Sequence, residues 1–320
     1  MGDLIKSEYL LKADRLVEQA EDLMDSNVMI DTKPRYEGTC ELYSIAADYF
    51  KISGKCALTP SILVDSGNCL VQCAKLQGKL GNRPETAAYY AEAARLYRSF
   101  DPEESLKFYR HAIAEFLELQ NFRVGARLQE EAAAALARGR AWGAAADGWR
   151  HAALLWAECR DPAGARGALL EAARLYAQAG DWAQAGACWR EAGHRDLRDN
   201  RLKFQAPALF LDACLALLAD QDLGALAEQV AEMARADAAF PRSKEHLFVR
   251  NLVRCVVDRD LDALADHVYD FDNVFKLGAT QIRMLAEVRA AVAAGWRREQ
   301  RRRARAEAER RRKREGKRQR

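Results

Sequence analysis

Large side chains flank small ones at helical spacing in five stretches of this chain. In "LYSIAADYF", Tyr43 and Phe50 enclose Ala46 and Ala47. Because positions i, i+3, i+4 and i+7 share one face of a helix, each stretch forms a single large–small–large stripe. The alanines let a neighbouring helix approach closely, and the bulky residues fill the space on either side. The other four stretches span Tyr90–Tyr97, Tyr109–Phe116, Trp149–Trp156 and Leu169–Tyr176.

The stripes return at a regular interval along the chain. From Tyr109 to Trp149 the period is about 40 residues, a length typical of helical repeats. Turn sequences separate the stripes, and the Asp–Pro pairs of "DPEE" and "RDPAG" suit helix starts, with Asp101 and Asp161 as N-caps. Units of two helices with this spacing are typical of tetratricopeptide-like (TPR-like) solenoids, whose units stack because none can bury its stripe alone. We therefore predict an all-α fold, a TPR-like right-handed α-α superhelix.

The pattern also suggests three regions. Paired helices continue past residue 200, but the regular period of the stripes is lost. A solenoid needs a cap over its last apolar face. We predict a solenoid over residues 1–200, a C-terminal helical bundle over 201–296, and a separate basic tail, helical or disordered, over 297–320.

The tail differs from the body in charge. Residues 297–320 contain fourteen Lys or Arg and four Glu, a balance of +10, whereas the whole chain carries +3. The body is therefore mildly acidic, at −7. Such a tail can contact anionic membrane, RNA or an acidic partner, or it can be a solvated terminus without a partner. Nucleic-acid binding is not expected of the body, which lacks a basic stripe with interleaved aromatic residues.

The sequence offers no catalytic apparatus. The glycines are scattered, the five histidines lie in different segments, and neither kind of residue forms a nucleotide-binding or nucleophile motif. We predict no catalytic residue, no cofactor and no metal site, and we expect the cysteines to be reduced, buried side chains. They stand at Cys40, Cys56, Cys69, Cys73, Cys159, Cys188, Cys214 and Cys255. Frequent charges near the N-terminus argue against a secretory signal, so we expect a cytoplasmic protein.

The order of segments resembles the soluble NSF attachment proteins (SNAPs), particularly the α type. The likeness runs from about residue 8 to 292 and includes "CELYSIAADYFK", "AAYYAEAARLYRSFDPEESLKFYRHAIAEF" and "LDALADHVYDFDNVFKLGATQIRMLAEVR". Two stretches, "TKPRYEGTCELYSIAADYFK" and "ALARGRAWGAAADGW", are closer to the γ type. The resemblance implies a non-enzymatic adaptor in vesicle trafficking, peripherally associated with membrane, which grips SNARE four-helix complexes and recruits the NSF ATPase. The alternative is a TPR-like scaffold in another assembly, without NSF coupling.

The resemblance also implies binding residues. Arg127 falls where the family carries a SNARE-contacting lysine, and Arg166 lies one position from a second such lysine. Because SNARE bundles have acidic surfaces, spaced cations suit their recognition. The full set of SNARE-binding candidates is Arg127, Arg166, Arg123, Lys55 and Arg98. Each could instead be a solvated surface charge, a reading that we favour slightly for Lys55 and Arg98.

On the side that faces the ATPase, the family uses acidic residues. Asp258 matches one of them and Asp222 lies near another, whereas Arg254 and Val257 replace two more. The family's membrane-dipping loop corresponds here to "DSNVMIDTKP", with Val28, Met29 and Ile30 as the apolar candidates. The basic tail stands where the family has a short acidic one, so the tail is our second candidate for contact with anionic membrane.

Overall fold

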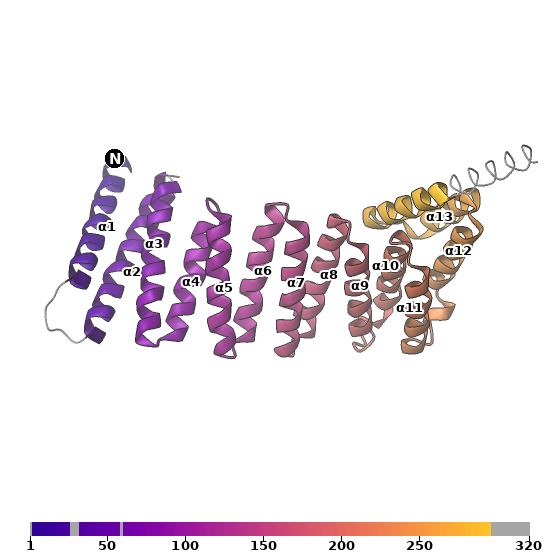
Figure 1. Ribbon diagram of the computed structural model, residues 1–320, viewed down its shortest axis with the longest axis horizontal. Coiled ribbons are helices and arrows are strands. Elements are labelled where there is room, and N and C mark those ends of the chain that lie inside the picture. The colour runs from indigo at the N-terminus through magenta and orange to yellow at the C-terminus, as the bar shows by residue number, and fades with distance from the viewer. Residues whose placement is uncertain (1, 26–31, 58–59, 296–320) are drawn as a thin grey trace, which may run out of the picture. The chain divides into compact units, whose positions relative to one another are not determined.

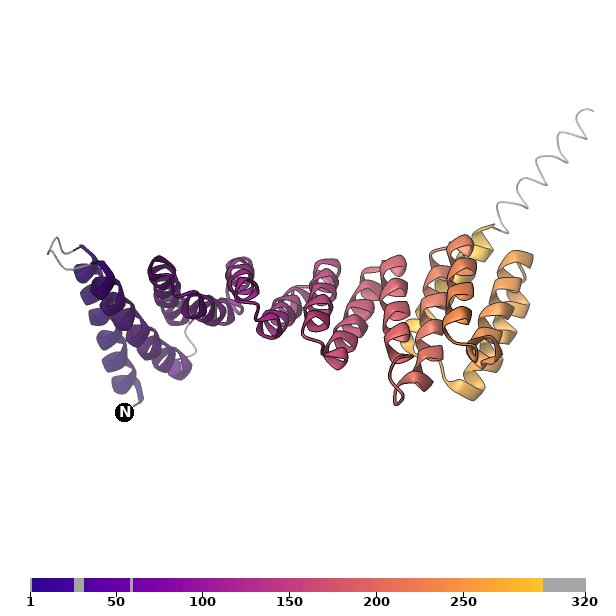
Figure 2. The same ribbon diagram turned by 90° about the horizontal axis from the view of Figure 1, so that it is seen from below.

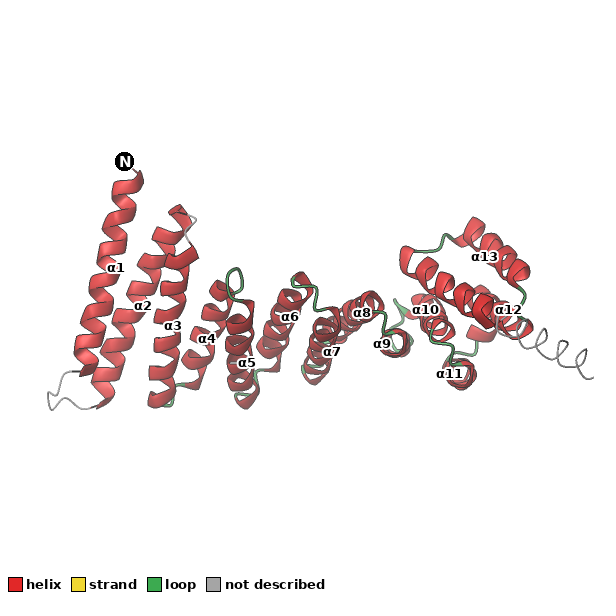
Figure 3. Cartoon of the chain, turned by 45° about the horizontal axis from the view of Figure 1, so that its top comes forward, coloured by secondary structure: helices red, strands yellow, loops and turns green. Residues whose placement is uncertain are grey.

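The computed structural model of this 320-residue chain describes residues 2–25, 32–57 and 60–295, with side chains for 8–25, 32–53 and 61–295. Every regular element in these ranges is a helix, and the segments between them are turns (Figure 3). Consecutive helices pack together as antiparallel pairs. The predicted all-α, TPR-like fold is confirmed.

The chain divides into two compact units, Met1–Ala168 and Leu169–Arg320. In the first unit each helix from α2 to α7 packs against the one before it along the chain (Figure 1 and Figure 2). Its helices are α1 (Gly2–Asp25), α2 (Thr32–Ala57), α3 (Pro60–Leu80), α4 (Arg83–Tyr97), α5 (Pro102–Glu118), α6 (Phe122–Arg138), α7 (Trp142–Glu158) and the start of α8 (Pro162–Ala179). The predicted boundaries, at residues 200/201 and 296/297, stay predictions.

The turns between helices recur at a regular interval in the middle of the chain. A residue with positive φ ends one helix and an N-cap residue starts the next. In each turn the backbone N–H of the residue after the positive-φ residue donates a hydrogen bond to the carbonyl five residues earlier, as Asn121 N does to Phe116 O at 2.8 Å. The predicted N-caps are confirmed, since Asp101 accepts from Glu104 N and Asp161 from Gly164 N. The positive-φ residues of this series are Gln120, Arg140, Arg160 and Gly180.

The large–small–large stripes form the core of the helix pairs, as predicted. Tyr109 and Ala112 on α5 are fully buried. They pack with Ala91 and Ala94 of α4 and with Leu128 of α6. The small residues let three helices meet around one ring, so the stripe fixes the spacing between neighbours.

The second unit contains the rest of α8 and a group of shorter helices. α10 (Ala206–Ala219) forms its centre, because almost every side chain from Phe210 to Ala219 is buried. α10 contacts α9 (Trp182–Asp196), α11 (Leu223–Ala236) and α12 (Lys244–Asp258), and α13 (Leu261–Phe275) packs on α12. Two 3-10 turns, η1 (Lys203–Gln205) and η2 (Phe240–Arg242), lie before α10 and α12, and a further helical stretch covers residues 279–295.

The described cysteines are free thiols inside this packing. Cys159 is half-buried and the other described cysteines are buried. Cys56 is not among them, because the side chains of residues 54–60 lie outside the described ranges. Cys73 donates its thiol to the carbonyl of Cys40 at 3.3 Å, between α3 and α2. The expectation of buried, free thiols is confirmed for these residues except Cys159, which is only half-buried.

The helical stretch 279–295 is fastened to the second unit by polar contacts. Gln281 donates to Asp212 on α10 at 2.6 Å. Arg283 donates to the carbonyl of Ala177 at 3.0 Å, and its guanidinium lies 5.1 Å from the ring centroid of Trp182. These contacts join the stretch to α8, α9 and α10.

Asp212 makes the stability of this docking depend on pH. Burial raises the pKa of Asp212 to about 6, and the hydrogen bond from Gln281 opposes part of that rise. An unfolded Asp titrates near pH ~4, so Asp212 stabilises the fold fully below about pH 4 and loses that contribution as pH rises through 6. Because the residue is half-buried, water screens part of the effect.

We expect Asp212→Asn to remove this dependence. Its unfolding free energy relative to the native chain should rise by about 1 to 2 kcal/mol between pH 4 and pH 7. Urea unfolding followed by circular dichroism at several pH values measures this difference. Parallel pH profiles for the two proteins would contradict the assignment.

Candidate cationic surface and acidic end

The predicted SNARE-binding cations share one set of helices in the first unit. Lys55 belongs to α2, and Arg98 is the C-cap residue of α4. Arg123 and Arg127 lie on α6, and Arg166 lies on α8. We call the exposed side of these four helices the even-helix face. The backbone therefore places all five candidates on the same alternate helices, whereas the side chain of Lys55 lies outside the described residues.

Arg123 and Arg127 form the exposed stripe of α6. They are one turn apart, and both are exposed. Arg123 is held in place, with its guanidinium 3.8 Å from the Asp161 carboxylate and 5.8 Å from the Trp156 ring centroid. Arg127 makes a looser electrostatic contact with Glu130 on the same helix. Of this pair, Arg127 is therefore the one better able to reach a ligand.

Two glutamates beside Arg127 organise the face. Burial raises the pKa of Glu130, while the indole N–H of Trp156 and the charge of Arg127 oppose this rise. Burial would also raise the pKa of Glu131, but Arg95, Tyr109 and Arg98 outweigh it and lower that pKa below its ordinary value. Both carboxylates thus attract the cations that surround them.

Several cations on this face are already paired with carboxylates of the same chain. Arg95 on α4 binds Glu131 through two hydrogen bonds, of 2.8 and 2.9 Å. Lys51 on α2 contacts Asp48 and Glu92. Arg98 is half-buried and acts on Glu131 from the end of α4. The face is therefore a mixed network in which Arg95 and Arg98 act on Glu131 and Arg127 acts on Glu130, rather than an uninterrupted basic surface.

Sequence reasoning missed Arg95, Glu130 and Glu131. For the glutamates a signal was present, because "RLQEE" places them one turn after Arg127 on the exposed side of α6. Arg95 had no such signal, since it meets Glu131 across 36 residues of sequence. Arg166 is half-buried on α8, five residues after Asp161 in sequence.

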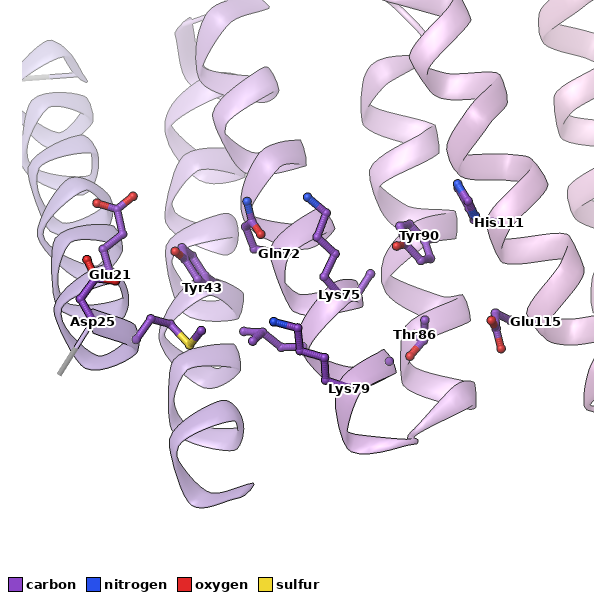
Figure 4. A pocket seen from close by; sticks show the side chains of 14 residues that line it. Glu21, Asp25, Tyr43, Gln72, Lys75, Lys79, Thr86, Tyr90, His111 and Glu115 are labelled. Atoms are coloured by element: carbon purple, nitrogen blue, oxygen red, sulfur yellow. The ribbon is translucent and has the colours of Figure 1, made fainter. Parts of the chain in front are cut away.

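A groove lies among the first five helices of the first unit. This groove of about 780 Å³ runs between α1, α3 and α5, with Tyr43 of α2 and Thr86 and Tyr90 of α4 at its floor (Figure 4). The carboxylates of Glu21 and Asp25 line one wall. Lys75 and Lys79 on α3 and His111 and Glu115 on α5 line the rest (Figure 4).

The groove carries both signs of charge. The His111 ring stacks on Tyr90 at 5.2 Å, and Glu115 lies 3.9 Å from Arg83. A small anion or a small cation would be repelled by the side chains of its own sign in this groove. The lining therefore suits a polypeptide that carries both signs of charge. None of the five predicted cations lines it.

The predicted acidic residues lie in the second unit. Asp222 is the N-cap of α11 and accepts from Ala225 N at 2.8 Å. Asp258, at the end of α12, is exposed and lies 3.6 Å from Arg254. Gln221 and Arg259, the neighbours of these aspartates, border one recess of about 190 Å³. The structure thus brings both acidic candidates to the same end of the bundle, which we call the acidic end.

Other sequence predictions fall on residues outside the described ranges. These are Val28, Met29 and Ile30 and the basic tail 297–320. In the described part of the chain, no helix combines the length and the apolar character needed to cross a bilayer. No three His, Cys, Asp or Glu side chains in that part are placed to hold a metal ion.

Comparison with known proteins adds independent information. The model of the family "Soluble NSF attachment protein, SNAP" matches residues 6–293. The β-soluble NSF attachment protein of Bos taurus is 23% identical, covering 81% of this chain and 84% of its own. The α-soluble NSF attachment protein of Saccharomyces cerevisiae is 24% identical over 71% of this chain and 78% of its own.

A probable vesicular-fusion protein sec17 homologue of Schizosaccharomyces pombe is 22% identical, over 81% of this chain and 87% of its own. These relatives match along most of their length, as the family model does along most of this chain. Together with the TPR-like helix pairs, the match establishes that the chain belongs to the family of soluble NSF attachment proteins.

Proposed function

We propose that this chain is an adaptor that binds SNARE complexes on its even-helix face and recruits an NSF-type ATPase through its acidic end. One observation carries the proposal. The five cations chosen from the family resemblance all fall on α2, α4, α6 and α8, although they lie far apart in the sequence. Cations carried by alternate helices of a solenoid are what an extended ligand requires.

The contacts on the even-helix face suggest how an acidic helical bundle would be held. Arg95 is bound within the protein by Glu131, so it serves to fix α4 against α6. Arg127 has only Glu130 as its partner among the interactions described. A carboxylate on the bundle would compete with Glu130 for the guanidinium of Arg127. Electrostatic complementarity of this kind sets register and the rate of association.

Recruitment of the ATPase rests on fewer residues. Asp222 and Asp258 present exposed carboxylates at the acidic end. Beside Asp258, however, Arg254 is 85% exposed and pairs with it, and the side chain of Val257 faces solvent. A basic partner surface would therefore meet a reduced negative charge here, so we propose weaker ATPase recruitment than an all-acidic end would give.

That departure supports a second candidate function. A TPR-like scaffold could retain the even-helix face for a helical ligand and lack coupling to the ATPase. The exposed Arg254 at the acidic end is the observation that favours this alternative.

A pull-down with purified SNARE complex and purified NSF tests both functions. The adaptor predicts a ternary complex in which NSF is captured only when this chain is present. Asp258→Lys should weaken capture of NSF and leave SNARE binding unchanged. Capture of SNARE complex alone would support the scaffold, and failure to bind either would refute the adaptor.

Peripheral membrane contact is part of the same proposal. The apolar residues Val28–Ile30 and the basic tail 297–320 are the candidates, and the tail has the larger potential contribution. Each basic residue near an anionic surface contributes about 1 kcal/mol, and the gain fades within a Debye length as salt rises. A solvated tail without a partner remains the alternative.

A further inference from the structure

We propose that a second membrane-binding surface lies in the Leu169–Arg320 unit, at the turn between α9 and α10. Its occupant is an anionic phospholipid surface. Its residues are Arg198, Arg201, Lys203 and Phe204, with Arg242 from a neighbouring turn, and we call them the Phe204 surface. The proposal does not depend on SNARE or NSF binding.

Phe204 is held out into solvent by a well-ordered turn. Its side chain is 81% exposed, the highest value among the large apolar residues described. Backbone hydrogen bonds fix the turn on both sides, from Lys203 N to Asp199 O at 2.9 Å and from Gln205 N to Leu202 O at 2.7 Å. A ring that the backbone presents in this way loses little conformational freedom when it inserts into a partner.

Exposed cations lie on the same turn as the ring. The ammonium of Lys203 lies 5.3 Å from the centroid of Phe204 and 3.4 Å from the amide oxygen of Asn200. Arg198 and Arg201 are exposed on the same turn. The acidic residue between them, Asp199, accepts the backbone N–H of Arg201 at 2.8 Å. The turn thus combines one apolar tip with three cations and one acid.

A chain of ring contacts brings a second basic turn to the same end of the bundle. His194 in the last turn of α9 packs on Phe210 of α10 at 5.2 Å, and Phe210 packs on Phe240 at 5.3 Å. Phe240 in turn contacts His246, in the first turn of α12, at 5.4 Å. The exposed Arg242 of η2 therefore lies at the end of the unit that carries Phe204.

The remaining charges of this second turn are largely committed. Lys244 lies 3.8 Å from Glu245, and its ammonium is 3.4 Å from the centroid of Phe275. Asp237 accepts the backbone N–H of Ala239 at 2.9 Å. Arg242 is thus the cation of this turn that is open to a ligand.

Charge is partly segregated along the bundle, although Arg254 and Arg259 lie at the acidic end and Asp199 lies at the other. Asp220, Asp222, Asp258 and Asp260 belong to the turns at the acidic end, whereas Arg198, Arg201, Lys203 and Arg242 lie at the other. The described part of this unit has more acidic than basic residues, so the basic end is not a consequence of composition. Its position calls for an anionic partner of its own.

The shape of the surface favours lipid as that partner. An aromatic ring on a projecting turn suits the boundary between headgroups and acyl chains, while flanking Lys and Arg reach the phosphates. An acidic protein would instead have to supply a pocket for the ring, and its attraction would come from the cations. The two partners therefore differ in how strongly binding depends on Phe204.

Sedimentation of the full chain with vesicles tests the proposal. The probes are pure phosphatidylcholine vesicles and vesicles in which about a third of that lipid is replaced by phosphatidylserine. Phe204→Ala and the double reversal Arg201→Glu with Lys203→Glu should each weaken binding to the anionic vesicles, by roughly fivefold or more. All variants keep the basic tail, so its contribution is constant across the comparison.

Matched controls come from the same unit. Tyr269→Ala removes a ring that is 68% exposed on the acidic helix α13. Arg250→Glu with Arg254→Glu gives the same change of net charge on α12. Both controls should bind like the native chain, and circular dichroism melting should be unchanged for all four variants, because the altered side chains are exposed.

Two results would overturn the proposal. In one, Phe204→Ala binds the anionic vesicles as tightly as the native chain, whatever the effect of the charge reversal. In the other, both Phe204 surface variants bind vesicles normally but lose an acidic protein such as the SNARE complex. That second result would assign the surface to a protein partner while leaving the proposed adaptor function intact.

Discussion

Tyr109→Ala is expected to lower the free energy of unfolding by about 3 to 5 kcal/mol, the range for removing a large aromatic side chain from a packed core. The ring of Tyr109 is fully buried between α4, α5 and α6. Its hydroxyl donates to Glu131 at 3.1 Å. The variant should therefore lose both packing and a hydrogen bond. Urea unfolding followed by circular dichroism measures the change.

Tyr109→Phe is the matched control, because it keeps the ring and removes only the hydroxyl. Its cost should be about 1 kcal/mol, since Glu131 retains its two hydrogen bonds from Arg95. Equal costs for the two variants would mean that the hydroxyl, rather than the stripe, holds the helices together. A loss below about 1 kcal/mol for Tyr109→Ala would place the ring outside the core.

The fold could be predicted from the sequence because the same residues indicate both the helices and the way these helices pack. Tyr109 and Ala112 indicate a helix by their spacing and indicate its neighbours by their size. Asp101 and Asp161 mark helix starts by local hydrogen bonding, which does not depend on the rest of the fold. The regular turn series was only partly visible, because Gln120, Arg140 and Arg160 adopt positive φ without the glycine that usually marks it.

The candidate site was less readable, for a physical reason. The helix assignment of Arg98, Arg123, Arg127 and Arg166 followed from local pattern. The local pattern did not show which of these cations are paired with a carboxylate, because such pairing depends on contacts between helices, such as that of Arg95 with Glu131. The Phe204 surface likewise needed the ring contacts that join α9, α10 and η2. A sequence gives the helical face of a charge more readily than its partner.

Arg127→Glu provides the test of the even-helix face. Arg127 is exposed in the second turn of α6, with Arg123 one turn before it. If an acidic bundle lies on this face, the substitution replaces an attraction with a repulsion. A close pair of this kind contributes about 1 to 3 kcal/mol, so SNARE affinity should fall by roughly 5- to 150-fold. Binding is measured by titration of purified SNARE complex.

Arg110→Glu is the appropriate control, because it makes the same change of charge on an exposed residue of α5, outside the even-helix face. Neither variant should move the melting temperature noticeably, since neither side chain is buried. If Arg127→Glu lowers affinity and Arg110→Glu does not, the effect belongs to the face rather than to net charge. Equal affinities for Arg127→Glu and the native chain would assign Arg127 to the solvated surface and leave its contact with Glu130 as its whole role.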